Sequence, residues 1–410
     1  MRLKDISILN PQYKGIPIDG DVSFVPMEAL RYGKIDLQEI PYSEGKGKYT
    51  YFANGDLLIA KVTPCFENGN IAIANSLKEG VGFGSSEIFV LRMNKNVLNT
   101  YMFYVVQTDR FQDSACATMC GVGGLKRISP LFMRTYEIAI PSITDQQRIV
   151  NYLDEKTSAI DNQIELLEKK QKLYVRLKAA TINRAVTRGL NDNVKLKDSG
   201  VDWIGMIPEH WTVRRIKDVV SDIFMGVSPV YEYDNENQNY VFGQRNNQLY
   251  GIDFGGIKFA KDDFFESRPK KEFLKFGDVL LNTLGGGSVG RTGYYDKNDG
   301  VPVITDGHVM IIRSKKYNTK FMYYYLYSQR GRLEMMAVGS TNQAFFNVSD
   351  IREISLPTTS LDEQQSIVSY LDERCAKIDD AIAIIDKQIK ALNKLKRSLI
   401  NEVVTGKRAV

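Results

Sequence analysis

The feature that most constrains the fold is a ten-residue motif that occurs twice. It reads Gln-Gln-Arg-Ile-Val-Asn-Tyr-Leu-Asp-Glu at 146–155 and Gln-Gln-Ser-Ile-Val-Ser-Tyr-Leu-Asp-Glu at 364–373. At a constant offset of 218 residues, the 42 residues that start with the motif match at 19 positions. Shorter matches upstream, such as GDLL at 55–58 and GDVL at 277–280, extend the repeat. Solenoid repeats are about 20–50 residues long, so this period predicts two copies of a whole domain followed by a helix.

Each motif begins a segment whose apolar residues recur at steps of three and four. The second segment keeps this pattern from Leu371 to Leu399, and the first follows the same frame with Gln171 at the position of Ile389. The pattern predicts two long helices with a heptad seam, which would pair antiparallel with each other. Gln171 either packs off the seam or fixes the register. Two unrelated surface helices are the simpler alternative.

Composition narrows the class of protein. The hydrophobic content of 43% is typical of a chain with buried cores. Without an eighteen-residue apolar run or an N-terminal signal region, we expect a cytoplasmic protein with no membrane partner. Cys116 and Cys120 lack nearby further ligands, so we expect buried free thiols and no metal site. The net charge of +5 is compatible with nucleic acid but does not by itself indicate it.

The segments before the helices alternate short strand-like runs with Gly, Asn and Pro turns. The predicted fold class is α+β, with two pseudo-symmetric globular domains separated by two long helices that form an antiparallel coiled coil. The expected divisions are a first domain at 1–143, a helix at 144–190, a linker at 191–210, a second domain at 211–358 and a helix at 359–410.

The loops diverge while the scaffold repeats. A Gly-rich loop at 119–129 carries two cations that suit phosphate or guanine, whereas the loop at 243–248 is rich in side chains able to form bidentate bonds with base edges. This pattern favours two readers of different targets, although neutral drift or ordinary flexible loops would look the same. The candidate DNA contacts are Lys61, Lys126, Arg127, Gln244, Arg245, Asn246, Arg291, Asn342 and Gln343, of which Lys61 and Arg291 suit phosphate.

The search for catalytic residues gives no candidate. The stretch GGGSVGRT at 285–292 is close to a phosphate-binding loop, but Arg291 replaces the lysine and no helical pattern follows, so a hairpin turn is expected. His210 and His308 have no Ser or Cys partner in a recognisable motif. The sequence therefore indicates a binding protein that is not an enzyme.

Together these motifs resemble the specificity subunit of type I restriction–modification systems. The resemblance rests on Pro-x-x-x-x-Gln-Gln-x-Ile-Val-x-Tyr-Leu-Asp-Glu at 141–155, its copy at 357–373 with two extra residues after the proline, the stretch at 197–211, and Thr-Arg-Gly-Leu at 187–190. It implies that the two domains are target recognition domains. Each would read one half-site of a bipartite target in double-stranded DNA, and the helix pair would set the unread spacer.

The resemblance also implies partners. Two modification subunits, which are adenine methyltransferases, would dock on the helices, and restriction subunits would join them to translocate and cut. S-adenosylmethionine, ATP and Mg would belong to those subunits, and this chain would hold no cofactor and no metal. The candidate partner contacts are Tyr152, Asp154, Glu155, Tyr370, Asp372 and Glu373. For the two tyrosines the first interpretation is core packing where the helix meets its domain, and contact with a modification subunit is the alternative.

Two other functions remain open at this point. One is a coiled-coil scaffold or adaptor without sequence-specific DNA binding, and the other is an enzyme with an unrecognised site, such as a stand-alone nuclease. The first domain begins almost at the counterpart of Val213. We therefore expect that it lacks a lead-in segment like 203–211, or that the start has been moved.

Overall fold

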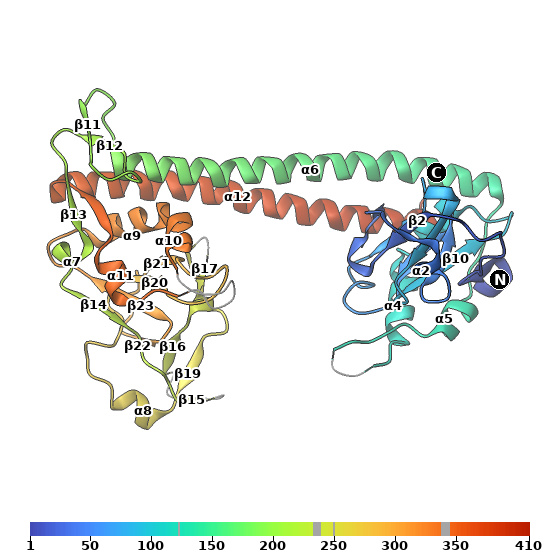
Figure 1. Cartoon of the computed structure of the whole chain (residues 1–410), viewed down its shortest axis with the longest axis horizontal. Helices are drawn as coiled ribbons and strands as arrows, with labels where there is room; N and C mark the ends of the chain where they lie inside the picture. Colours follow the sequence, from blue (N-terminus) through green and yellow to red (C-terminus); the bar gives the residue numbers. More distant parts are fainter. Residues whose placement is uncertain (122–123, 233–238, 249–250, 338–344) are drawn as a thin grey trace. The chain divides into compact units, whose positions relative to one another are not determined.

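Two compact units make up the chain. The computed structural model describes residues 1–121, 124–232, 239–248, 251–337 and 345–410. Unit 1 consists of 1–167 with 386–410, and unit 2 of 168–385. The long helices α6 (Ile143–Arg188) and α12 (Leu361–Val404) are both divided between the units: one part of each helix belongs to unit 1 and the other part to unit 2 (Figure 1). The prediction of a long continuous helix after each motif is confirmed.

Local sequence sets the ends of these helices. The Ser142 hydroxyl accepts a hydrogen bond from the Asp145 N–H at 3.1 Å before α6, and the Ser360 hydroxyl accepts one from the Glu363 N–H at 3.2 Å before α12. Such caps satisfy backbone donors that have no partner inside the helix. After α6, Gly189 adopts a left-handed φ of 73°, which ends the helix at little steric cost.

Unit 1 has two sheets, with strand orders β1-β10-β7-β8 and β5-β2-β9-β6, and a hairpin of β3 and β4. Its strands are β1 (Ser7–Leu9), β2 (Asp21–Val25), β3 (Leu30–Arg31), β4 (Lys34–Ile35), β5 (Gln38–Pro41), β6 (Thr50–Ala53), β7 (Leu57–Ala60), β8 (Ile71–Ile73), β9 (Val81–Gly84) and β10 (Ile88–Met93). Its helices include α1 (Leu3–Ile6), α2 (Tyr42–Gly45), α3 (Asn99–Val105), α4 (Asp109–Ala117), α5 (Pro130–Thr135) and the short 3-10 turns η1 (Met27–Ala29) and η2 (Lys78–Gly80).

Unit 2 repeats the first sheet as β14-β23-β20-β21 and has a second four-stranded sheet in the order β15-β19-β16-β22. Its strands are β11 (Leu196–Asp198), β12 (Met206–Pro208), β13 (Thr212–Arg215), β14 (Asp222–Met225), β15 (Tyr231–Glu232), β16 (Tyr240–Phe242), β17 (Asn247–Gln248), β18 (Gly251–Ile252), β19 (Lys258–Ala260), β20 (Val279–Asn282), β21 (Thr292–Tyr294), β22 (Val303–Thr305), β23 (Val309–Arg313) and β24 (Ser355–Thr358). Its helices include α7 (Ile216–Val219), α8 (Asp262–Glu266), α9 (Thr319–Ser328), α10 (Arg330–Met336), α11 (Val348–Arg352) and the 3-10 turn η3 (Gln244–Asn246).

The strand pairing confirms the pseudo-symmetry. In the second sheet of each unit one pair is parallel, β2 with β9 in unit 1 and β16 with β22 in unit 2, and the neighbouring pair is antiparallel. The repeated Gly-Asp motif lies at the start of β7 and β20. There Asp56 and Asp278 are almost fully buried, and each accepts two bonds from an arginine, Arg92 and Arg313 respectively. The α+β prediction is therefore confirmed.

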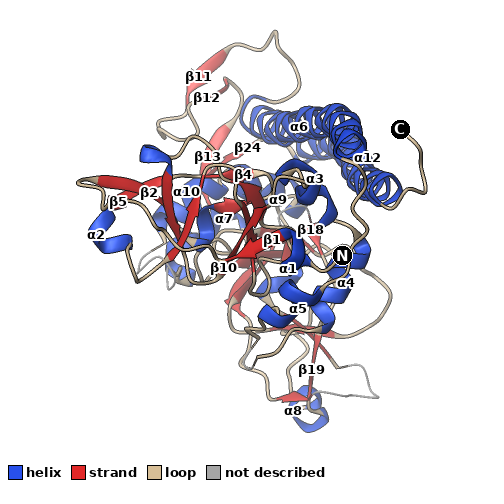
Figure 2. Ribbon diagram, turned by 90° about the vertical axis from the view of Figure 1, so that its right-hand side faces the viewer, coloured by secondary structure: helices blue, strands red, loops and turns tan. Residues whose placement is uncertain are grey.

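Each unit's core is completed by helix residues from both halves of the sequence. In unit 1, Val150 and Leu153 of α6 pack in the same cluster as Ile400 of α12. In unit 2, Leu371 of α12 packs with Val186 of α6. The side-by-side ribbons of α6 and α12 in Figure 2 agree with these contacts. The antiparallel pairing is thus confirmed within each unit.

Several smaller expectations can be checked against the described residues. The stretch that precedes Arg291 joins the antiparallel strands β20 and β21, which confirms a hairpin turn. Cys116 and Cys120 are free, but Cys120 is exposed and Cys116 only half-buried, so the expectation of buried thiols is wrong. Among the described residues, no group of three or more His, Cys, Asp or Glu could hold a metal. No helix there has the length and apolarity to span a membrane.

Candidate nucleic-acid interface

Unit 1 brings three of the predicted DNA contacts together. The loop with Lys126 and Arg127 pairs with the chain that follows β7: the Thr63 N–H donates to the Lys126 carbonyl at 2.9 Å, and the Ile128 N–H donates to the Lys61 carbonyl at 2.9 Å. The Thr63 hydroxyl also accepts from the Lys126 N–H at 2.9 Å. The three cationic residues therefore belong to one fixed surface, which we call the unit 1 basic cluster.

The carboxylate of Glu87 binds one of the cations of this cluster. Arg127 donates from Nε and Nη2 to the two oxygens of Glu87, at 2.9 and 3.0 Å. This hydrogen bonding lowers the pKa of the Glu87 carboxyl, and Lys61, whose ammonium lies 5.5 Å from the Phe89 ring centre, adds to the effect. Lys126 is exposed and has no ion pair with any described residue. Lys126 can bind an anion directly, whereas Arg127 must first break its ion pair with Glu87.

In unit 2 the predicted residues 244–246 form η3, and their roles differ. Asn246 is 2% exposed; its side-chain oxygen accepts from the Gly243 N–H and its amide nitrogen donates to the Asp253 carbonyl, both at 2.9 Å. With both ends of its amide bonded inside the turn, Asn246 offers nothing to a base. The prediction of a base contact there is corrected: Asn246 shapes the turn.

The other two η3 residues stay near the surface. Gln244 is half-buried and its side-chain oxygen accepts from the Ser288 hydroxyl at 3.0 Å, while Arg245 is exposed. Arg291 follows in the adjacent β20–β21 turn, where its Nε donates to the Gly287 carbonyl at 3.0 Å. The structure therefore brings Gln244, Arg245 and Arg291 into one region. The predicted contacts Asn342 and Gln343 lie outside the described residues.

The aspartates of the repeated motif bind the first part of α6 to unit 1 and the first part of α12 to unit 2. Asp154 accepts from the Tyr104 hydroxyl at 2.5 Å, and Asp372 accepts from the Tyr324 hydroxyl at 2.6 Å and from Lys320 at 2.8 Å. Burial raises the pKa of Tyr104 and Tyr324 most, and the neighbouring Asp154 and Asp372 carboxylates raise it further. These contacts give both aspartates a role within the chain, while their assignment as partner contacts stays a prediction.

The remaining motif residues face solvent to different degrees. Glu155 and Glu373 are exposed, and among the described residues they bond to Lys156 and Lys377 on the same helix. Tyr152 is half-buried, whereas Tyr370 is 40% exposed. With Leu177, Arg184 and Leu190, Tyr370 lines a groove of about 310 Å³ in unit 2. Tyr152 packs against the core of unit 1, as the core-packing interpretation predicts, whereas the exposed Tyr370 does not favour it.

Sequence reasoning missed the most buried polar residues of the repeat. Gln146 and Gln364 are 0% and 1% exposed, and each accepts a bond from the backbone N–H just before α3 or α9, at 2.8 and 2.9 Å. Lys396 donates to Asp161 and Lys178 to Asp379 across the helix pair. Both pairs obey the 218-residue offset, so identity between the repeats could have revealed them.

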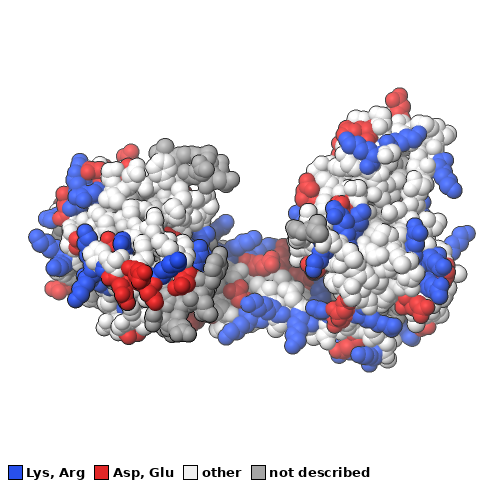
Figure 3. All heavy atoms as spheres, turned by 90° about the horizontal axis from the view of Figure 1, so that it is seen from below, with Lys and Arg blue, Asp and Glu red and all other residues white. Residues whose placement is uncertain are grey.

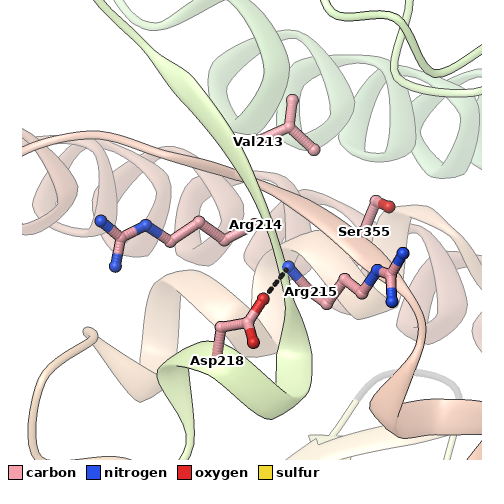
Figure 4. A pocket seen from close by; sticks show the side chains of 5 residues that line it. All are labelled: Val213, Arg214, Arg215, Asp218 and Ser355. Atoms are coloured by element: carbon pink, nitrogen blue, oxygen red, sulfur yellow. Dashed lines mark hydrogen bonds between the residues drawn. The ribbon is translucent and has the colours of Figure 1, made fainter.

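One open pocket near β13 gives no anion site. It has about 460 Å³ and is lined by Arg214, Arg215 and Asp218. Figure 4 shows the two guanidinium groups extending to opposite sides of the strand, and Arg215 is paired with Glu353 at 2.8 Å. On the face drawn in Figure 3, basic side chains are interspersed with acidic ones. The candidate interface therefore rests on the unit 1 basic cluster and the η3 region.

Comparison with known proteins gives consistent results. A family model described as the type I restriction modification DNA specificity domain matches residues 19–173 and 208–394. The specificity subunit of the type I restriction enzyme EcoEI from Escherichia coli is 37% identical over 152 residues, which cover 36% of this chain and 26% of that protein. The chain thus matches about a quarter of the length of this relative and of the similar EcoAI subunit, 34% identical.

A longer match comes from an archaeon. The MjaVIII specificity subunit of Methanocaldococcus jannaschii is 26% identical over 342 residues, which are 80% of this chain and 75% of that protein. Among solved structures, a chain from a study of the assembly and conformational transition of the type I R-M system superposes with a TM-score of 0.73 at 18% identity, covering 98% of this chain and 96% of that one. This likeness shows a shared fold.

Proposed function

This chain belongs to the type I restriction modification DNA specificity family, and from that premise we propose that it reads a bipartite target in double-stranded DNA. The globular part of each unit acts as a target recognition domain and takes one half-site. The observation that carries the proposal is the matched pair of α+β scaffolds, which present different polar side chains on their loops. A scaffold protein without DNA recognition would not need two such surfaces.

The two surfaces suit two kinds of contact. Contacts to phosphate fix the register of a protein on DNA, and contacts to base edges carry the sequence information. In this proposal Lys61, Lys126 and Arg291 contact phosphates. Arg127, Gln244 and Arg245 carry the side-chain donors and acceptors that read base edges in the major groove. Arg127 is paired with Glu87, so it can contact a base only after this ion pair is broken. This cost favours a base with strong acceptors, such as guanine.

The helices have the second role. In this proposal the α6–α12 pair sets the unread spacer and docks two modification subunits, and restriction subunits join that complex. The exposed groove at Tyr370, with the exposed carboxylates of Glu155 and Glu373, is the surface we assign to docking. Methyl transfer, DNA cutting and their S-adenosylmethionine, ATP and Mg belong to the partners, so the chain itself is non-catalytic. Its location is the cytoplasm, with the DNA.

Sequencing of DNA methylation in a host that carries the whole system tests this proposal. We expect one methylated motif made of two defined parts with an undefined gap between them. A host with the same modification and restriction subunits but without this chain is the control, and it should lack the motif. A single continuous motif, or a motif that persists without this chain, would refute the proposal.

A further inference from the structure

A small polar pocket opens beside η3 in unit 2. It has a volume of about 180 Å³, and its lining includes Tyr231 of β15, Lys258 of β19, Asp306 after β22, and Gln244 and Arg245 of η3. We call it the η3 pocket. Its charged residues come from three separate segments of the chain, so no sequence motif reveals them. It combines the exposed guanidinium of Arg245, which offers several donors, with the carboxylate of Asp306, which offers acceptors. A carboxylate is unusual on a surface that would face polyanionic DNA.

Asp306 is fixed in place at this pocket. Its side-chain oxygen accepts from the His308 N–H at 3.0 Å, and its own N–H donates to the Phe242 carbonyl at 2.9 Å. A Cβ added to Gly243 would lie 2.7 Å from the other carboxylate oxygen, so a glycine is needed for the turn to approach so closely. Burial raises the pKa of Asp306, while Lys258 and the N–H groups of His308 and Gln244 oppose that rise. An ionised carboxylate offers acceptors only.

The cations of the pocket form no salt bridge with this carboxylate, although Lys258 acts on it electrostatically. Neither Arg245 nor Lys258 forms an ion pair with any residue in the described part of the chain. The Arg245 guanidinium lies against Gly256, where an added Cβ would be 2.7 Å from its Nη2. The Lys258 ammonium lies 4.5 Å from the centre of the Tyr231 ring. The pocket therefore presents cationic donors that have no ion-pair partner among the described residues, beside a carboxylate that is held by the backbone.

This pattern complements one base pair. In the major groove guanine presents two acceptors, O6 and N7, which match an arginine fork, and its partner cytosine presents an amino donor, which matches a carboxylate. An A·T pair in the same orientation would place an amino donor against the arginine and an acceptor, thymine O4, against the carboxylate. A T·A pair would keep an acceptor and an amino donor in these places but would offer the arginine fork one acceptor, thymine O4, instead of two. Each mismatch leaves a polar group without a partner.

We propose that the η3 pocket reads a guanine–cytosine pair in the half-site of unit 2, with Arg245 on guanine, Asp306 on cytosine and Lys258 on a neighbouring phosphate. This assignment rests on the proposed function. It makes Asp306 a specificity-determining residue. A carboxylate repels the phosphates of any DNA, and it favours binding only where a base presents an amino group to it. Lys258 offsets that repulsion.

The test is the methylated motif of variants within the complete system. Asp306→Asn keeps the shape of the side chain but replaces one acceptor oxygen by a donor. Arg245→Lys keeps the charge but removes the fork. Both variants should relax the same G·C position of one half-site, lowering its preference by about tenfold, in line with the discrimination of a bidentate contact. The other half-site and the spacer should not change.

A matched control is Asp263→Asn, the same chemical change on the exposed side of α8. It should leave every position of the motif as in the wild type. If Asp306 only holds the turn, Asp306→Asn will lower methylation at all sites without relaxing any position, and the assignment is overturned. A two-part motif that neither variant changes also overturns it but leaves the proposed function standing. A continuous wild-type motif refutes the proposed function itself.

Discussion

Single residues of the repeated motif hold each helix in its unit. The Gln146 side chain accepts from the Leu98 N–H and donates to the carbonyls of Asn96 and Pro141, each within 3.0 Å. Gln364 does the same with the Asn318 N–H and the Thr359 carbonyl. The bonded N–H groups stand at the start of α3 and α9, where a helix has no internal acceptor for them. A glutamine that looks like a surface residue in the sequence is therefore a buried connector.

Replacement of this glutamine should destabilise unit 1. Gln146→Leu would leave several buried backbone groups without partners, and each costs about 1–3 kcal/mol. We expect the free energy of unfolding to fall by about 2–4 kcal/mol in urea denaturation followed by circular dichroism. The control is Gln147→Leu at the next position, where the side chain is exposed and, within the described part of the chain, donates to Asn151 on the same helix. Equal losses for the two variants would contradict this role.

Pairs of charges fix how the two long helices meet. Lys396 donates to Asp161 at 2.7 Å in unit 1, and Lys178 donates to Asp379 at 2.7 and 2.8 Å in unit 2. Both lysines are almost fully buried, so a shift in the register of the two helices would leave a buried ammonium group without its carboxylate partner. The two ion pairs are equivalent in the repeat, and they bracket the segments of α6 and α12 that pass from one unit to the other.

Lengthening both helices between these ion pairs should change the spacer alone. Seven residues inserted after Lys170 and seven after Lys387 keep the heptad seam and add about 10 Å to each helix at 1.5 Å per residue. We expect the gap of the methylated motif to grow by up to about three base pairs while both half-sites persist. An insertion in α6 alone is the control and should abolish the motif, because the two ion pairs can no longer form together. A changed half-site would contradict the division of roles.

The helices also show where prediction from sequence succeeds and where it stops. The heptad pattern sufficed for the existence, length and antiparallel pairing of α6 and α12, since periodicity reports which face of a helix is buried. It does not report what covers that face, so the entry of Leu399 and Val403 into the core of unit 1 was not foreseen. Asn246 was misassigned for a related reason: an amide able to read adenine can equally satisfy its own turn.

At the scale of the whole molecule, both units depend on buried tyrosines. Burial raises the pKa of Tyr101 in unit 1 and of Tyr295 in unit 2 to about 12, and it raises the pKa of Tyr104 and Tyr324 further. In the unfolded chain these phenols ionise near pH 10. Above that pH the unfolded chain holds fewer protons than the folded one, so stability falls as pH rises. Below pH 10 these groups have no such effect.

We therefore expect the melting temperature to drop steeply between pH 10 and 12, measured by circular dichroism at constant ionic strength. Tyr101→Phe removes one of the responsible groups without emptying its site, so the slope of melting temperature against pH should be shallower. Tyr370→Phe is the control because that ring is 40% exposed. An equal slope in wild type and Tyr101→Phe would show that this tyrosine does not govern alkaline unfolding.

The contribution of residues 386–410 to unit 1 dictates an order of events on the ribosome. Unit 2 is one continuous stretch, 168–385, whereas unit 1 starts with the first residue and closes with the last segment. At about 5–20 residues per second, synthesis of everything after residue 167 takes roughly 10–50 s. Through that time the apolar face that will meet Leu399 and Val403 lacks its cover. Residues 1–167 are synthesised before unit 2, yet unit 1 can be completed only after it, and during that interval its uncovered apolar face is open to aggregation or to a chaperone.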